Sequence, residues 1–214
     1  RDYISKEKPD VILNLLDASN LERNLYLTTQ IVEMGFPTVI ALNMMDIVKK
    51  RGDIINKDEL SKKLGCVVVE TSALKNEGSM AAAERAIQLA KETKEQKVEH
   101  NFDSKVEETL SSIETIIKAV VEKSQLRWFS IKLFERDEKA VAGLNLTAEN
   151  KKAIEEIIAK CEAGMDDDSE SIITNERYSF IVSIIDGVLK KKNKGALSTS
   201  DKIDKIVTNR ILAL

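Results

Sequence analysis

The chain has 214 residues, a formal net charge of −3 and 43% hydrophobic residues, the composition of an ordinary globular protein with one large or two small domains. Its slightly negative charge gives no electrostatic case for binding nucleic acid, because a phosphate backbone needs a basic face. Two cysteines, Cys66 and Cys161, are too few for a disulfide framework or a cysteine metal site. They favour burial as small apolar side chains in a reducing compartment.

No apolar run approaches the roughly 18 residues that cross a bilayer, and no signal-peptide pattern is present. The chain begins at Arg1 rather than at Met, and it ends in the apolar run 210–214. We therefore expect both ends to continue into a longer polypeptide.

Residues 1–92 alternate short apolar runs with amphipathic segments, which is typical of βαβ units on a parallel sheet. Strands are predicted at 11–16, 38–42 and 66–70. Helices are predicted from an N-cap at Ser19 or Asn20 to a stop at Gly35, over 58–64, and from Ser79 onward.

Residues 93–214 begin with a charged stretch, after which strand-like runs disappear. Helices are predicted over 104–124, 128–136, 147–164, 169–192 and 198–214. The last helix is amphipathic, and it fits a membrane interface and the surface of the helical domain equally well. The fold class is therefore α/β with a mostly parallel sheet, followed by an all-α helical domain.

Polar residues follow the second and third predicted strands. Asn43 and Asp46 come after one strand, and Ser72 and Ala73 come after the next. Since ligands of parallel sheets bind beyond the carboxyl ends of the strands, both loops face one crevice. The carboxylate of Asp46 can accept both N1–H and N2–H₂ of guanine, a contact that rejects adenine.

The neighbouring residues have matching roles in such a site. Asn43 can join the two loops and contact N7, the amide of Ala73 can donate to O6, and Ser72 can hold its loop against the Asp46 side chain. N-x-x-D alone is a weak motif, because Asn and Asp are also common turn residues. The order strand, N-x-x-D, strand, S-A is what favours a guanine site.

That order resembles the fourth and fifth guanine motifs of Ras-like GTPases. The segments DASNLERNLYLT (17–28), ALNMMD (41–46), RWFSIKLFE (127–135) and the tail 197–210 are similar to the ferrous iron transport protein B family. Most Ras-like proteins carry Lys at the position of Met44, whereas this transporter family commonly has Met there.

The resemblance implies that residues 1–92 are the C-terminal half of a Ras-like GTP-binding domain. Residues 93–214 would be a helical, guanine-dissociation-inhibitor-like domain that leads to a membrane domain. The cofactors would be GTP and GDP, bound through Asn43, Met44, Asp46, Ser72, Ala73 and Leu74, with Met44 and Leu74 flanking the base. The intact protein would couple GTP hydrolysis to Fe²⁺ uptake at the cytoplasmic face of the bacterial inner membrane. Its oligomeric state stays open.

The sequence contains no G-x-x-x-x-G-K-[ST] and no D-x-x-G. A P-loop holds the phosphates, and its hydroxyl binds Mg²⁺, so these ligands would lie outside this chain and no catalytic or metal-binding residue is assigned within it. In the family, the phosphate-binding parts precede the position of Arg1. Two alternatives remain: a soluble Ras-like GTPase fragment with a helical appendage, and a pseudo-GTPase whose helical half binds a protein.

Other candidates have plainer explanations. Residues 22–24 fit the solvated first turn of a helix better than a functional cluster. Trp128 fits core packing better than a partner anchor. His100 has no Cys or His neighbour for a metal, and 166–168 fit a solvated loop or a helix N-terminus better than a calcium loop.

Overall fold

The computed structural model describes residue 4, residues 7–92 and residues 100–192. Its first part contains three parallel strands in the order β1-β2-β4, namely β1 (Ile12–Asp17), β2 (Thr38–Asn43) and β4 (Val67–Glu70). Asp17 pairs with Asn43, so β1 and β2 end at the same level. β2 lies between the other two strands and is buried from Thr38 to Leu42, which explains its nearly continuous apolar sequence.

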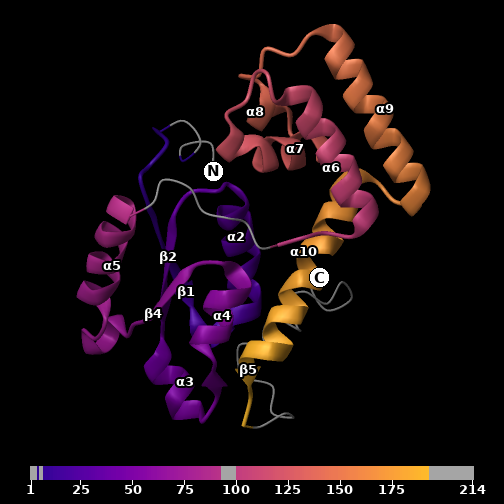
Figure 1. Ribbon diagram of the computed structural model, residues 1–214. Helices are drawn as coiled ribbons and strands as arrows, with labels where there is room; N and C mark the ends of the chain where they lie inside the picture. The colour runs from indigo at the N-terminus through magenta and orange to yellow at the C-terminus, as the bar shows by residue number, and fades with distance from the viewer. Residues whose placement is uncertain (1–3, 5–6, 93–99, 193–214) are drawn as a thin grey trace, which may run out of the picture.

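Helices cover both faces of this sheet (Figure 1). α2 (Leu21–Glu33) and α4 (Lys57–Leu64) lie on one face, and α5 (Ser79–Glu92) lies on the other. The connections contain the 3-10 turns η1 (Ala18–Asn20) and η2 (Ala73–Lys75), helix α3 (Met45–Arg51) and strand β3 (Ile54–Ile55). This is the layered α/β arrangement predicted for residues 1–92.

The second part is mostly helical. It contains α6 (Ser104–Ile117), η3 (Lys123–Gln125), α7 (Leu126–Phe134), α8 (Glu138–Val141), α9 (Ala148–Met165), α10 (Ser169–Val188) and β5 (Leu189–Lys190). The N-cap expected at Thr147 is confirmed, since its hydroxyl accepts from the Asn150 amide. Asp168 caps α10 in the same way through the Ser171 amide, so the acidic run 166–168 does end at a helix N-terminus.

The fold class predicted from the sequence is confirmed, but several boundaries differ. The helix expected over 104–124 ends at Ile117, and the helix expected over 169–192 ends at Val188. After Val188 the chain leaves the helix, because Leu189 and Lys190 pair with β3 in antiparallel orientation. Strand β5 thus contradicts the expectation that residues 93–214 hold only helices. The helix expected over 198–214 lies outside the described residues.

Helix α3 was not among the predicted elements, because its seven residues contain only three apolar ones, Met45, Ile47 and Val48, too few for a clear helical period. The N-cap expected at Ser19 or Asn20 is also different. Asn20 precedes α2 without capping it through its side chain, and Asp17 instead accepts from the Ser19 amide.

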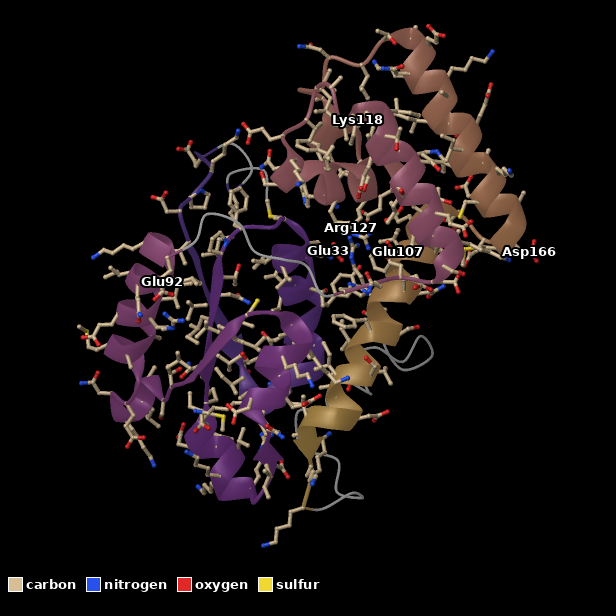
Figure 2. All side chains as sticks on the ribbon, viewed as in Figure 1. Glu33, Glu92, Glu107, Lys118, Arg127 and Asp166 are labelled. Carbon is tan, nitrogen blue, oxygen red and sulfur yellow. The ribbon has the colours of Figure 1, made fainter. Side chains whose placement is uncertain are left out.

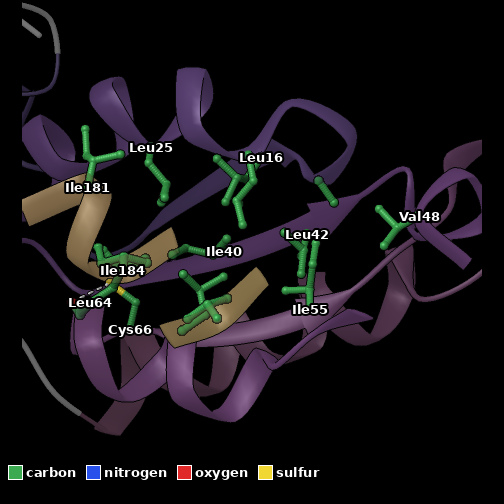
Figure 3. Packing of buried hydrophobic residues seen from close by; sticks show 14 of the residues in the cluster. Leu16, Leu25, Ile40, Leu42, Val48, Ile55, Leu64, Cys66, Ile181 and Ile184 are labelled. Carbon is green, nitrogen blue, oxygen red and sulfur yellow. Dashed lines mark hydrogen bonds between the residues drawn. The ribbon is translucent and has the colours of Figure 1, made fainter. Parts of the chain in front are cut away.

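The buried apolar residues form two clusters, and α10 contributes to both. Ile172 and Ile173 pack with α6, α7 and α9 in the second part. Ile181, Ile184 and Val188 pack instead with the sheet and its helices, as Figure 3 shows for Ile181 and Ile184 beside Leu25 and Ile40. The gold ribbon of α10 therefore runs from the second part along the first (Figure 1). Residues assigned by sequence to the helical domain complete the core of the α/β part.

Both cysteines are buried, as expected, and Trp128 is 2% exposed, which agrees with a packing role. His100 is buried as well, at 5% exposure, where the two parts meet. Its ring stacks on Phe180 of α10 at 3.9 Å and meets the edge of Phe102 at 4.4 Å. Neither ring nitrogen has a hydrogen-bond partner among the described residues. Burial, followed by the charges of Arg127 and Arg177, lowers the pKa of His100 from 6.5 to about 3.

His100 should make the fold sensitive to acid. Between pH 6.5 and pH 3 the unfolded chain binds a proton at this ring and the folded chain does not, so stability falls as the pH falls. We expect His100→Phe, which keeps an aromatic ring, to lose about 2 kcal/mol less stability than the wild type between pH 7 and pH 5. Urea unfolding at both pH values measures this difference. Equal losses in the two proteins would show that His100 is not held neutral.

Candidate guanine-binding site

The loops after β2 and β4 are joined by main-chain hydrogen bonds. The Thr71 amide donates to the Leu42 carbonyl at 2.9 Å, and the Met45 amide donates to the Thr71 carbonyl at 3.3 Å. These bonds extend the pairing of β2 and β4 beyond the last residues of the strands. The parallel sheet thus brings the two polar loops of the sequence together at one edge.

Asn43 links the loops through its side chain. Its Oδ1 accepts from the Ala73 amide at 3.0 Å and from Thr71 Oγ1 at 3.4 Å. The first of these bonds differs from the sequence-based assignment, in which the Ala73 amide donates to guanine O6. In this structure that amide is bonded to Asn43, so a base would have to share it or replace Asn43.

Asp46 and Ser72 form the second link. Ser72 is 3% exposed, and its Oγ donates to Asp46 Oδ1 at 2.8 Å. Asp46 lies in the first turn of α3, where the helix dipole favours a negative charge. The bond occupies one carboxylate oxygen, and the other has no hydrogen-bond partner among the described residues. The Ser72 to Asp46 contact expected from the sequence is therefore present.

Two apolar side chains lie exposed beside this polar pair. Met44 has a left-handed backbone, with φ 66° and ψ 23°, and is 39% exposed at the start of α3. Leu74 is 89% exposed in η2. A non-glycine residue with positive φ is uncommon and often marks a functional turn. Exposed apolar groups in the same two loops as a carboxylate suit contact with the faces of a planar base.

The loop 72–78 closes on itself. Ser72 and Glu77 exchange main-chain hydrogen bonds of 3.0 Å in each direction, and Asn76 adopts φ 57° between them. Gly78 then has φ 75°, and a Cβ at this position would overlap the Glu70 carbonyl oxygen. Only glycine satisfies both conditions, so Gly78 sets how tightly the loop folds back on β4.

Asp17 lies at the edge of the site and was not among the predicted site residues. It ends β1 opposite Asn43, and its carboxylate accepts from the Ser19 amide at 2.8 Å and from Asn20 Nδ2 at 3.1 Å. Burial raises the pKa of Asp17, but these hydrogen bonds outweigh it and leave the pKa below its usual value. Arg51 of α3 donates to the Ser19 carbonyl at 3.1 Å. The position of Asp17, directly after the predicted strand 11–16, is the feature of the sequence that could have indicated this role.

Residues 22–24 behave as the surface of a helix. Glu22 and Arg23 are exposed in the first turn of α2, and Asn24 Nδ2 donates to the Asn20 carbonyl at 3.0 Å. In the described ranges, no group of three or more His, Cys, Asp or Glu side chains is placed to hold a metal ion. No helix among them is both long and apolar enough to cross a membrane.

Two family models match this chain. The model described as ferrous iron transport protein B matches residues 1–86, and that of the FeoB cytosolic helical domain matches residues 102–190. The crystal structure of a GDP-bound mutant of the S. thermophilus FeoB G-domain is 40% identical, with a TM-score of 0.85, over 89% of this chain and 73% of that chain. The chain belongs to the ferrous iron transport protein B family.

Other members of the ferrous iron transport protein B family agree with this assignment. NFeoB from S. thermophilus, solved with GDP.AlF4- and K+, is 42% identical with a TM-score of 0.81, over 86% of this chain and 72% of that one. The Fe(2+) transporter FeoB of Escherichia coli is 33% identical over 99% of this chain and 27% of its own length. A fusion protein of Porphyromonas gingivalis, named Fe(2+) transport protein A/Fe(2+) transporter FeoB, is 34% identical over 99% of this chain and 26% of its own length. The chain spans about a quarter of the length of these curated relatives.

Four of the six residues assigned from the sequence are joined by hydrogen bonds: Asn43 with Ala73, and Asp46 with Ser72. Met44 and Leu74 lie beside them without joining this network. Contact of these six residues with a base stays a prediction.

Gly78→Ala should open the loop that carries Ser72 and Ala73. A left-handed φ costs an alanine roughly 1–2 kcal/mol, and the clash with the Glu70 carbonyl adds to this cost. We expect the free energy of unfolding, measured with urea, to fall by about 2 kcal/mol or more. Gly164→Ala is the matched control, because a Cβ there meets nothing within 4 Å on helix α9. The control should be neutral or stabilising, and equal losses in both variants would refute the role given to Gly78.

Proposed function

We propose that this chain is the guanine-recognising half of a GTP-binding domain, joined to a helical module, in a bacterial ferrous iron transporter. The observation that carries the proposal is the bond from Ser72 Oγ to Asp46 Oδ1, because it fixes a carboxylate within the two loops that also carry the exposed side chains of Met44 and Leu74. The loops that supply these groups follow adjacent strands of a parallel sheet.

The proposed contacts account for selection of guanine. Asp46 would accept N1–H and N2–H₂ together, a charge-assisted pair of bonds that adenine cannot make. Met44 and Leu74 would cover the faces of the base. Asn43 would keep the two loops at a constant separation, since its Oδ1 already bonds to Ala73 and Thr71. An adenine in this site would leave buried donors and acceptors unpaired.

The phosphates and Mg²⁺ would be held by parts of the intact protein outside these 214 residues. One surface supports this proposal. β1 is at the edge of the described sheet, and its residues Leu13 and Leu15 are 46% and 67% exposed. Leu27, on helix α2 that packs against β1, is 54% exposed. Exposed apolar side chains at a free strand edge suit the packing of further structure. We propose that the remainder of the GTP-binding domain covers them.

In the intact protein, GTP binding and hydrolysis would be coupled to Fe²⁺ uptake at the cytoplasmic face of the inner membrane. The helical module would pack on the GTP-binding domain, adjust nucleotide release and connect it to a downstream membrane segment. Relatives solved with GDP, and with GDP.AlF4- and K+, support the nucleotide part of this proposal. The relatives named as Fe(2+) transporters support Fe²⁺ as the ion that the intact protein would transport.

Asp46→Asn should change the base preference of the intact protein. An amide has one oxygen instead of two and so cannot accept N1–H and N2–H₂ side by side, whereas its NH₂ group can donate to the O2 carbonyl of xanthine. We expect the affinity for GDP to fall by about 100-fold or more and the affinity for XDP to rise, as measured by displacement of a fluorescent guanine nucleotide. Asp58→Asn is the matched control, because Asp58 occupies the first turn of α4 away from both loops. Unchanged preference in Asp46→Asn would favour a pseudo-GTPase whose helical half binds a protein.

The 214-residue chain alone should bind GDP very weakly and hydrolyse no GTP. Its sequence contains no G-x-x-x-x-G-K-[ST] to hold the phosphates and Mg²⁺. Single-turnover assays with radiolabelled GTP measure the rate directly, and the complete protein serves as the positive control. Release of phosphate by the chain alone above the uncatalysed rate would contradict the proposal that hydrolysis needs parts of the protein outside these 214 residues.

A further inference from the structure

One charged residue interrupts the apolar face of α10. Ile173, Arg177, Ile181, Ile184 and Val188 follow one another at intervals of three or four residues, so their side chains lie on one side of the helix. Ile173 belongs to the core of the helical part, whereas Ile181, Ile184 and Val188 belong to the core of the α/β part. Arg177 lies between the two cores and is 1% exposed.

The guanidinium of Arg177 joins three elements. Its Nε lies 3.0 Å from Glu33 Oε1, and its Nη2 lies 2.7 Å from Glu33 Oε2, so the pair is bidentate. Its Nη1 lies 2.6 Å from Glu135 Oε1, directly after α7. Figure 2 places Glu33 where the α/β part meets the helical part. Glu33 is the last residue of α2, so its bonds with Arg177 connect the α/β part to the helical part.

The charges in this buried cluster balance. Lys132 Nζ lies 2.6 Å from the second oxygen of Glu135, and Lys132 is itself 4% exposed. The neutral ring of His100 fills the remaining side, with Nδ1 3.8 Å from Glu33 Oε1. Two cations thus face two buried carboxylates, while the more exposed Asp137 lies 3.5 Å from Lys132 Nζ at the edge of the cluster.

Such a cluster fixes geometry more strictly than apolar packing does. A bidentate guanidinium–carboxylate pair has a narrow range of angles and distances, and any shift leaves a buried charge unpaired. Apolar side chains can instead slide and repack with little change in buried area. The cluster therefore selects one arrangement of α2 against α10 from those that the two cores would allow.

The two helices held in this way both lead to the candidate guanine site. α2 is roughly 20 Å long and starts at the η1 turn. In that turn, the Ser19 amide donates to Asp17, and the Ser19 carbonyl accepts from Arg51. Tyr26 of α2 stacks on Tyr178 of α10 at 5.2 Å along the same contact. At the other end of α10, β5 pairs with β3, which follows α3 and its Asp46. α10 therefore contacts α2 directly, and it is connected to α3 through β5 and β3.

We propose that Arg177 is a positioning residue, which through Glu33 holds α2 and α10 in the arrangement that retains bound guanine nucleotide. The proposal rests on the guanine-binding function proposed above, and it assigns the slowing of nucleotide release by the helical module to one buried ion pair. Arg177 does not touch the nucleotide in this account. It acts by fixing the position of α2 relative to α3 and the loop after β4.

The first test measures geometry in the 214-residue chain. Glu33→Met/Arg177→Met replaces both charges by flexible apolar side chains and leaves Glu135 paired with Lys132. Spin labels at the exposed positions Lys50 and Ser112 report the distance between the two parts, since Cys66 and Cys161 are buried. We expect one narrow distance distribution in the wild type and a clearly broader one in the double variant. An equally narrow distribution would overturn the proposal.

The second test measures nucleotide release from the complete protein. We expect the double variant to release fluorescent GDP at least about fivefold faster than the wild type. The matched control is Arg85→Met/Glu92→Met, which removes an ion pair of 3.2 Å confined to α5 on the other face of the sheet. This control should leave both the distance distribution and the release rate unchanged.

A third variant covers the case in which the double variant fails to fold. Arg177→Lys keeps the charge but loses the bidentate fork, so we expect a smaller acceleration of release in a folded protein. Unchanged release in a folded Arg177→Lys or double variant, with normal GDP binding by the wild type, overturns this inference and leaves the proposed function standing. Failure of the wild-type complete protein to bind GDP overturns the proposed function itself.

Discussion

The parallel pairing of β1, β2 and β4 determines where every polar residue of the candidate site lies. Asp17 and Asn43 end their strands as direct neighbours, and Leu42 pairs with Glu70 just before the Ser72 loop. Because parallel strands have their carboxyl ends at the same edge, residues more than 50 positions apart in sequence meet there. A change of register by one residue would move the buried side chains of β2 to the opposite face and separate these loops.

Helix α10 has a comparable role at the level of the whole chain. It supplies Ile172 and Ile173 to one core and Ile181, Ile184 and Val188 to the other. The two parts therefore share a helix instead of being joined by a linker alone, and neither core is complete without it. The ion pair of Arg177 with Glu33 lies at the point where the helix passes from one core to the other. This arrangement gives the helical part a direct mechanical contact with α2.

The site itself combines rigid and adaptable contacts. Ser72 and Asp46 are fixed by a bond of 2.8 Å, and Gly78 confines the loop that carries Ser72. The Ala73 amide, in contrast, is bonded to Asn43 and would have to change partner to reach a base. Exchange of that bond is a small movement, because the two loops are already joined by main-chain hydrogen bonds.

The sequence by itself determined the α/β class, the helical second part and the placement of Asn43, Asp46 and Ser72 at the ends of two strands. Those properties follow from local periodicity and from residue types placed directly after buried strands. It did not determine where α10 ends, because the main chain of Leu189 and Lys190 pairs with strand β3, which lies more than 130 residues earlier in the sequence. The burial of Arg177 and His100 was likewise decided by tertiary structure. A charged side chain and an imidazole can be buried only where distant segments supply Glu33, Glu135 and the rings of Phe102 and Phe180, and no local pattern records such partners.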